Sequence, residues 1–153
     1  MRAVVGGAGA VAAYVFTDWR MWPHTSAAIE MAGLCLRGML VWDKLTPALG
    51  WQWRLQHELI AWAAVKAHKT TQRANVLGFK RSGNPHHPTE KPLPLLEAIV
   101  ANSAAELVFD PFMGSGTTGV ACARLGIPFI GVEIDPEHFQ TACERIEQAA
   151  ITG

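Results

Sequence analysis

The residues best suited to chemistry lie between positions 108 and 118, in the sequence VFDPFMGSGTT. The pattern predicts a short buried strand, a glycine turn and the start of a helix. Glycine tolerates positive φ and lets backbone approach a ligand, and the free N–H groups of a helix start point into the turn. A second expected strand, 128–132, ends at Glu133, whose carboxylate can accept hydrogen bonds from a ribose. This unit predicts the cofactor half of a nucleotide-type α/β site.

Two cofactor classes fit a glycine turn of this kind. Gly114 to Gly119 forms a G-x-G-x-x-G pattern, and Glu133 follows at close to the dinucleotide-fingerprint spacing. Asp110 argues against a nicotinamide dinucleotide, because a carboxylate at the strand end would repel a pyrophosphate. The same carboxylate suits S-adenosylmethionine, which carries an ammonium group, a sulfonium and a ribose. No Gly-Lys-Ser/Thr follows the turn, which excludes a P-loop. A tight turn without a ligand is the remaining alternative.

Three motifs occur in an order that resembles a known family. They are HPTEKP at 87–92, DPFMGSGT at 110–117 and GVEID at 131–135. Together they resemble the DNA amino-methyltransferases, which methylate the exocyclic amine of adenine (N-6) or cytosine (N-4). The HPTEKP-like element comes first, which is similar to the permuted (β-type) order of that family. The resemblance is strong over 84–148 and weaker over 10–65, where YVFTDWR at 14–20 and HELI at 57–60 are similar to the family's later strands.

The resemblance implies an α/β fold, namely a circularly permuted, Rossmann-like, S-adenosylmethionine-dependent methyltransferase fold. It also implies which residues would bind S-adenosylmethionine: Asp110, Pro111, Phe112, Gly114, Ser115, Gly116, Thr117 and Glu133. Thr89 and Lys91 of the HPTEKP-like element would close over the methionine part, where Lys91 could pair with the carboxylate. The alternative for Lys91 is a surface charge before a helix.

The family's catalytic tetrapeptide is Asp, Asn or Ser followed by Pro-Pro and an aromatic residue. The chain has nine prolines but no Pro-Pro, so we assign no catalytic residue. In the family these residues orient the target amine and stack the flipped base. We expect the central strand that carries them to lie before Met1, in a missing N-terminal segment or a partner chain. The sheet would then have a gap at its middle, and residues 4–9 would replace a helix end and a glycine turn.

Formal net charge is zero, but its distribution is uneven. The segment 66–91 is basic and the chain beyond 97 is acidic. A basic segment beside a cofactor site predicts phosphate contact with double-stranded DNA. The candidate DNA-binding residues are Lys66, Lys69, Arg73, Lys80 and Arg81, in a loop that could serve as a short target-recognition segment. The alternative is a solvated loop with chance lysines.

The 153 residues are enough for one domain with a core, so we treat 1–153 as a single domain. No apolar run is long enough for a membrane span. Three cysteines without C-x-x-C spacing favour the cytoplasm, although residues 1–16 partly imitate a signal peptide. The histidines show no metal-ligand spacing. Of the six tryptophans, Trp19 and Trp22 follow a strand end, where one could stack on a base, although packing is the favoured role.

The remaining pattern predicts how the elements position these residues. We expect strands at 11–17, 36–42, 59–66 and 107–109 and helices at 23–32, 92–102, 115–125 and 136–149. By resemblance, 36–42 and 59–66 form an antiparallel edge pair. Residues 43–53 and the polar stretch 70–88 are expected to be loops.

The sequence leaves four interpretations open. The first is a site-specific DNA methyltransferase, truncated before its catalytic strand. The others are a non-catalytic S-adenosylmethionine-binding remnant or subunit, a nicotinamide-dependent oxidoreductase, and a gene relic that does not fold.

Overall fold

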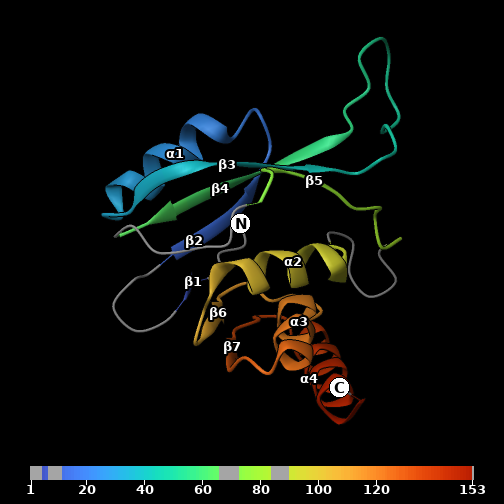
Figure 1. Ribbon diagram of the computed structural model, residues 1–153. Coiled ribbons are helices and arrows are strands. Elements are labelled where there is room, and N and C mark those ends of the chain that lie inside the picture. Colours follow the sequence, from blue (N-terminus) through green and yellow to red (C-terminus); the bar gives the residue numbers. More distant parts are fainter. Residues whose placement is uncertain (1–4, 7–11, 66–72, 84–89, 153) are drawn as a thin grey trace.

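A mixed sheet of seven strands, in the order β5-β3-β4-β2-β1-β6-β7, runs through the protein (Figure 1). The computed structural model describes residues 5–6, 12–65, 73–83 and 90–152. The strands are β1 (Val5–Gly6), β2 (Ala12–Thr17), β3 (Cys35–Asp43), β4 (His57–Ala64), β5 (Val76–Gly78), β6 (Val108–Asp110) and β7 (Phe129–Gly131). The helices are α1 (Trp22–Met31), α2 (Leu93–Ser103), α3 (Thr117–Leu125) and α4 (Pro136–Thr152). The expected α/β class and the expected helices are confirmed.

Strand β2 shows why the sheet has helices on both faces. Tyr14 and Phe16 belong to the apolar cluster that includes α2 and α3. Ala13 and Val15 belong to the cluster that includes α1. Successive side chains of a strand point to opposite faces, so a strand that is apolar at every position must be covered twice. Figure 1 shows α1 on one side of the sheet and α2, α3 and α4 on the other.

The directions of the strands bring the functional residues to one edge. Strands β2 and β3 are each antiparallel to β4, and β3 is parallel to β5. Strand β1 is antiparallel to both β2 and β6, and β6 is parallel to β7. The carboxyl ends of β2, β3, β5, β6 and β7 therefore point the same way, and β4 begins where they end. We call this side of the sheet the carboxyl edge.

The expected gap at the middle of the sheet is wrong. Strand β1 lies between β2 and β6, with Val5 opposite both Ala13 and Phe109. Pairing on both sides satisfies backbone groups that a gap would leave without partners in the interior. This strand, Val5–Gly6, lies within the segment 4–9 that was expected to replace a helix end and a glycine turn.

Two further expectations also need correction. Strands β3 and β4 are antiparallel, as expected, but they are not the edge of the sheet, because β5 continues it beyond β3. Strand β5 lies inside the segment expected to be a polar loop. Backbone hydrogen bonds to β3 hold it at both ends. Val41 N–H donates to Asn75 O (2.8 Å) just before β5, and Phe79 N–H donates to Asp43 O (3.0 Å) just after it.

Candidate functional site

Asp110 organises the glycine turn from inside. It ends β6 and is fully buried. Its Oδ1 accepts a hydrogen bond from Phe112 N–H (3.1 Å), and its Oδ2 accepts one from the Thr118 hydroxyl (2.8 Å). Thr118 lies in the first turn of α3, so this carboxylate lies beside the positive end of a helix, where an anion is stabilised.

This position bears on the choice of cofactor. In dinucleotide-binding folds the pyrophosphate lies at the N-terminus of the helix that follows the glycine turn. Here Asp110 already places a carboxylate next to that turn. A second anion would be repelled by it, and this repulsion supports the sequence-based argument against a nicotinamide dinucleotide.

Two glycines of the G-x-G-x-x-G pattern, Gly116 and Gly119, serve packing. Gly116 has φ +79°, and a Cβ atom there would lie 2.7 Å from the Cβ of Ala142 in α4. A Cβ atom on Gly119 would lie 2.7 Å from a ring carbon of Phe129 in β7. Helix α4 and strand β7 therefore approach α3 closely only because these positions lack side chains. The spacing that resembles the dinucleotide fingerprint is thus explained without a dinucleotide.

Two hydroxyl groups in the turn lack a hydrogen-bond partner among the described residues. Ser115 and Thr117 are fully buried. Within the part of the chain that the structure describes, neither Ser115 Oγ nor Thr117 Oγ1 has a hydrogen-bond partner. Buried polar groups in native proteins almost always have partners. The two hydroxyls therefore mark the turn as a place where a ligand or ordered water could bind.

Glu133 faces the turn from the end of β7. Its Oε2 accepts a hydrogen bond from Gly114 N–H (2.8 Å), and its Oε1 accepts from the N–H groups of Ile134 (2.9 Å) and Asp135 (3.0 Å). The hydrogen bond from Asp135, with those from Gly114 and Ile134, lowers the pKa of Glu133 although burial opposes this. A carboxylate has about four lone-pair positions, so an ionised Glu133 can still accept a hydroxyl group.

A cavity of about 750 Å³ opens at the carboxyl edge and joins the turn to the rest of the sheet. Phe112, Gly114 and Glu133 line the side next to β6 and β7, and Phe16, Thr17 and Asp18 line it at the end of β2. The side next to β3, β4 and β5 is charged. Its ionisable residues are Lys44, His57, Glu58, Arg81 and Lys91.

The predicted cofactor residues divide between the cavity and the layer behind it. Lys91, Phe112, Gly114 and Glu133 line the cavity. The others that the structure describes support the turn, and they are Asp110, Pro111, Ser115, Gly116 and Thr117. Thr89 lies outside the described residues.

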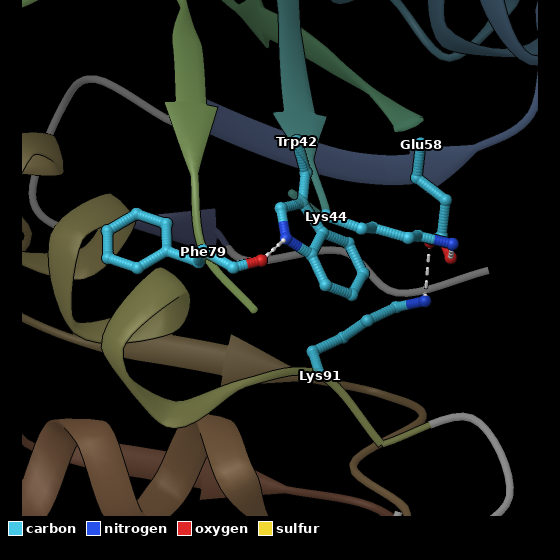
Figure 2. A network of polar contacts seen from close by, with 5 residues as sticks. All are labelled: Trp42, Lys44, Glu58, Phe79 and Lys91. Carbon is cyan, nitrogen blue, oxygen red and sulfur yellow. Dashed lines mark hydrogen bonds and ion pairs between the residues drawn. The ribbon is translucent and has the colours of Figure 1, made fainter. Parts of the chain in front are cut away.

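Lys91 has a partner within the protein (Figure 2). Its Nζ lies 2.6 Å from Glu58 Oε2, and Lys44 Nζ lies 2.7 Å from Glu58 Oε1. Lys91 Nζ also lies 5.2 Å from the ring centroid of Phe16 and 5.5 Å from that of Trp42, within cation–π range. The alternative that Lys91 is a simple surface charge is therefore wrong.

Glu58 remains charged within this network. Burial tends to raise its pKa, but the positive charge of Lys91 and the hydrogen bonds from Lys44 and Lys91 outweigh it and lower the pKa of Glu58. Trp42 is fixed beside the two lysines, because its indole N–H donates to Phe79 O (2.7 Å). Two lysines and one carboxylate leave this side of the cavity with a net positive charge.

Arg145 of α4 joins the glycine turn to the segment that contains Lys91. One guanidinium nitrogen donates to Ser115 O (2.6 Å), and the other donates to Glu90 Oε1 (3.1 Å). Glu90 is buried and immediately precedes Lys91. The sequence analysis missed both Arg145 and Glu58. The GVEID motif and the helix after it indicate no role for an arginine ten residues further on, and HELI predicts only a strand.

Comparison with known proteins identifies the family. The sequence model of the N6/N4 DNA methylases, described as "DNA methylase", matches residues 72–144. The chain is 34% identical over 137 residues to YubD of Escherichia coli (strain K12), covering 86% of this chain and 60% of that protein. It is 30% identical over 151 residues to the type II methyltransferase M2.LlaDCHI of Lactococcus lactis subsp. cremoris, covering 82% and 56%.

A crystal structure of the M1.HpyAVI–SAM complex superimposes with a TM-score of 0.76 at 30% identity, over 88% of this chain and 74% of that one. The chain belongs to the DNA methylase family. The resemblance and the Rossmann-like methyltransferase fold are thereby confirmed. The chain spans 60% or less of the length of the two curated relatives.

The basic segment of this DNA methylase does not form a single patch. Arg81 follows β5 and lines the cavity at the carboxyl edge. Arg73 precedes β5 and lines a second cavity of about 370 Å³ beside Tyr14 and Trp62. Strand β5 therefore separates two residues that were expected to act together. Lys80 is exposed next to Arg81, and Lys66 and Lys69 lie outside the described residues.

Other reactive groups contribute little to the site. Burial, reinforced by the negative charge of Asp110, raises the pKa of Cys122 to about 12, which rules out a thiolate nucleophile there at neutral pH. Trp22 packs with the cluster under α1, and Trp19 is exposed beside Arg20. Within the described ranges, no three His, Cys, Asp or Glu residues gather as metal ligands, and none of the helices is long and apolar enough to cross a membrane.

Proposed function

We propose that the cavity at the carboxyl edge binds S-adenosylmethionine, and that the chain is part of an enzyme that methylates an exocyclic amine in double-stranded DNA. The observation that carries this proposal is that one cavity joins the glycine turn and Glu133 to a positively charged, aromatic side. The first side fits a nucleoside, and the second fits a carboxylate or phosphate. The relative from L. lactis is named a type II methyltransferase, and the M1.HpyAVI structure is a complex with SAM.

The residues present fit S-adenosylmethionine. Glu133 has acceptor capacity for ribose hydroxyls. Phe112 is 56% exposed and lines the cavity, where its ring can cover an adenine. The buried hydroxyls of Ser115 and Thr117 offer donors near the turn. When bound, the cofactor supplies a methyl group on a sulfonium.

We also propose that Lys91 exchanges Glu58 for the carboxylate of the methionine part. Both are anions, and Lys91 lines the same cavity as Glu133. Lys44 keeps Glu58 paired during the exchange, because it holds the other carboxylate oxygen. The network in Figure 2 therefore allows the exchange without leaving a buried charge unpaired.

We further propose that the Asp/Asn/Ser-Pro-Pro-aromatic tetrapeptide is supplied from outside these 153 residues, by another segment or a partner chain. The sequence contains no Pro-Pro. On this proposal the chain binds the cofactor but does not transfer methyl groups by itself. The alternative is a non-catalytic cofactor-binding subunit. It predicts the same cofactor binding, but no added segment would restore methyl transfer.

Calorimetric titration of the purified chain with S-adenosylmethionine tests the proposal. We expect saturable binding that Glu133→Gln weakens by about 10-fold, because a neutral amide is a poorer acceptor for ribose hydroxyls than a carboxylate. Glu137→Gln is the matched control, since it makes the same change at an exposed site in the first turn of α4.

A parallel titration with NAD and a methyl-transfer assay on mixed-sequence DNA complete the test. We expect no NAD binding and no transfer of labelled methyl groups by the chain alone. Tighter binding of NAD than of S-adenosylmethionine would contradict the cofactor assignment. Methyl transfer by the isolated chain would contradict the proposed external tetrapeptide while supporting the reaction.

A further inference from the structure

The loop between β3 and β4, residues 44–56, exposes the most prominent aromatic side chains of the described surface. Trp51 is 94% exposed and Trp53 is 93% exposed, and Leu49 beside them is 97% exposed. Large apolar side chains grouped at one exposed site indicate an interaction surface. We call this segment the tryptophan loop. Figure 1 shows it projecting beyond the sheet from the ends of β3 and β4.

The tryptophan loop has a defined internal structure. Ala48 N–H donates to Leu55 O (2.8 Å), and Lys44 N–H donates to Gln56 O (2.9 Å). The Arg54 Nε–H group donates to Ala48 O (2.8 Å). These bonds tie the two arms of the loop together, so the indoles at its tip are held out in solvent. A rigid aromatic group loses less conformational entropy on binding than a flexible one.

Gln52, between the two tryptophans, has φ +50°. Left-handed backbone is unfavourable for residues other than glycine, and such strain clusters at binding sites. In a regular strand Trp51 and Trp53, two positions apart, would point to the same face of the loop. The left-handed Gln52 between them departs from this strand geometry at the tip.

The charge and position of the loop select its partner. Residues 44–57 contain Arg54, His57 and Lys44, of which Lys44 is paired with Glu58, and no acidic residue. Ala48 and Leu55, on the two arms, line the same cavity as Phe112 and Glu133. A partner of this loop therefore meets positive charge and flat aromatic rings directly beside the proposed methylation site.

We propose that the tryptophan loop binds DNA, with Trp51 and Trp53 stacked on bases next to the nucleotide that enters the cavity. This inference rests on the proposed function. Enzymes that modify a base must unstack it, and aromatic side chains that stack on or wedge between bases stabilise the distorted duplex. Phosphates would lie against Arg54 and His57.

Fluorescence anisotropy with a labelled mixed-sequence duplex tests this inference. The variants are Trp51→Leu/Trp53→Leu, which keeps apolar bulk but not aromatic stacking, and Trp51→Phe/Trp53→Phe, which keeps both. We expect the leucine pair to weaken DNA binding by about 10-fold or more and the phenylalanine pair by about 3-fold or less. S-adenosylmethionine affinity and the thermal melt should match wild type, since both side chains lie in solvent.

The salt dependence separates stacking from charge. The leucine pair should lower affinity at every salt concentration without changing the slope of log K against log[salt]. Arg54→Gln is the matched comparison, and it should reduce that slope by about one unit, because it removes one phosphate contact.

The outcomes are distinct. Equal DNA affinity for wild type and the leucine pair would overturn this inference alone. A wild-type chain that binds neither DNA nor S-adenosylmethionine would overturn both this inference and the proposed function. A tryptophan-dependent dimer in gel filtration, with unchanged DNA affinity in the leucine pair, would overturn it in favour of self-association.

Discussion

The Nζ atom of Lys91 lies 2.6 Å from Oε2 of Glu58, which joins the segment before α2 to the start of β4. Lys44, just after β3, holds the other carboxylate oxygen at 2.7 Å. One acidic side chain thus connects three segments that are distant in sequence. The same carboxylate offsets part of the positive charge of the two lysines, both of which line the cavity.

Glu58→Gln should destabilise the protein at neutral pH, because the two lysines lose the charge that they share. The pKa of Glu58 is lowered in the folded state from its usual 4.5. Its contribution to stability is therefore fully present above 4.5 and is lost as pH falls through the folded-state pKa. Denaturant melts at neutral and acidic pH measure the free energy of unfolding. The difference in this free energy between wild type and Glu58→Gln should become smaller in acid.

Glu30→Gln on α1 provides the control for that experiment, since Glu30 is exposed. It should behave as wild type at each pH. If the difference in free energy of unfolding between wild type and Glu58→Gln stays constant across the acid range, the ion pairs do not stabilise the fold.

Arg145→Gln should lower the free energy of unfolding by about 2–4 kcal/mol. The variant loses the bond to Ser115 O and removes the guanidinium partner of buried Glu90. Arg124→Gln is the comparison, because Arg124 pairs with Glu97 at the surface, with its side chain 51% exposed. Such a pair contributes about 0.5 kcal/mol or less. Equal effects in urea unfolding would contradict the bridging role of Arg145.

Gly116→Ala should be more harmful than Gly126→Ala. Both glycines have positive φ, +79° and +67°, which costs an alanine about 1 kcal/mol. At Gly126 nothing lies within 4 Å of an added Cβ, whereas at Gly116 it would lie 2.7 Å from Ala142 Cβ. Overpacking adds about 1–3 kcal/mol. Chemical denaturation should therefore rank the two variants clearly, and similar losses would show that α4 yields to the added methyl group.

The sequence predicted the cofactor half of the site well because local patterns determine it. Asp110, the glycine turn and Glu133 lie on consecutive elements of one β-α-β unit, and their spacing follows from strand and helix lengths. Lys44, Glu58 and Arg145 could not be placed in this way. They meet only through the order of strands in the sheet and the packing of α4, which no local pattern reports.

Strands β5 and β1 show that local sequence patterns also fail to predict part of the fold. Val76–Gly78 is three residues long inside a polar stretch, and Val5–Gly6 is two residues long beside glycines. Neither carries enough alternation to predict a strand. Each exists because a neighbouring strand offers unpaired backbone groups. The separation of Arg73 from Arg81 follows directly from the first of these two strands.

Adjacent threonines in the glycine turn should respond in opposite ways to the same substitution. Thr118→Val removes the hydroxyl that donates to Asp110 Oδ2, and loss of a donor to a buried carboxylate should lower the free energy of unfolding by about 1–3 kcal/mol. Thr117→Val removes a buried hydroxyl that has no partner among the described residues. Its stability without ligand should stay equal to wild type or rise by up to about 1 kcal/mol.

If the Thr117 hydroxyl serves the cofactor, titration with S-adenosylmethionine should show about 10-fold weaker binding for Thr117→Val. Unchanged cofactor affinity of Thr117→Val would show that the Thr117 hydroxyl does not serve the cofactor.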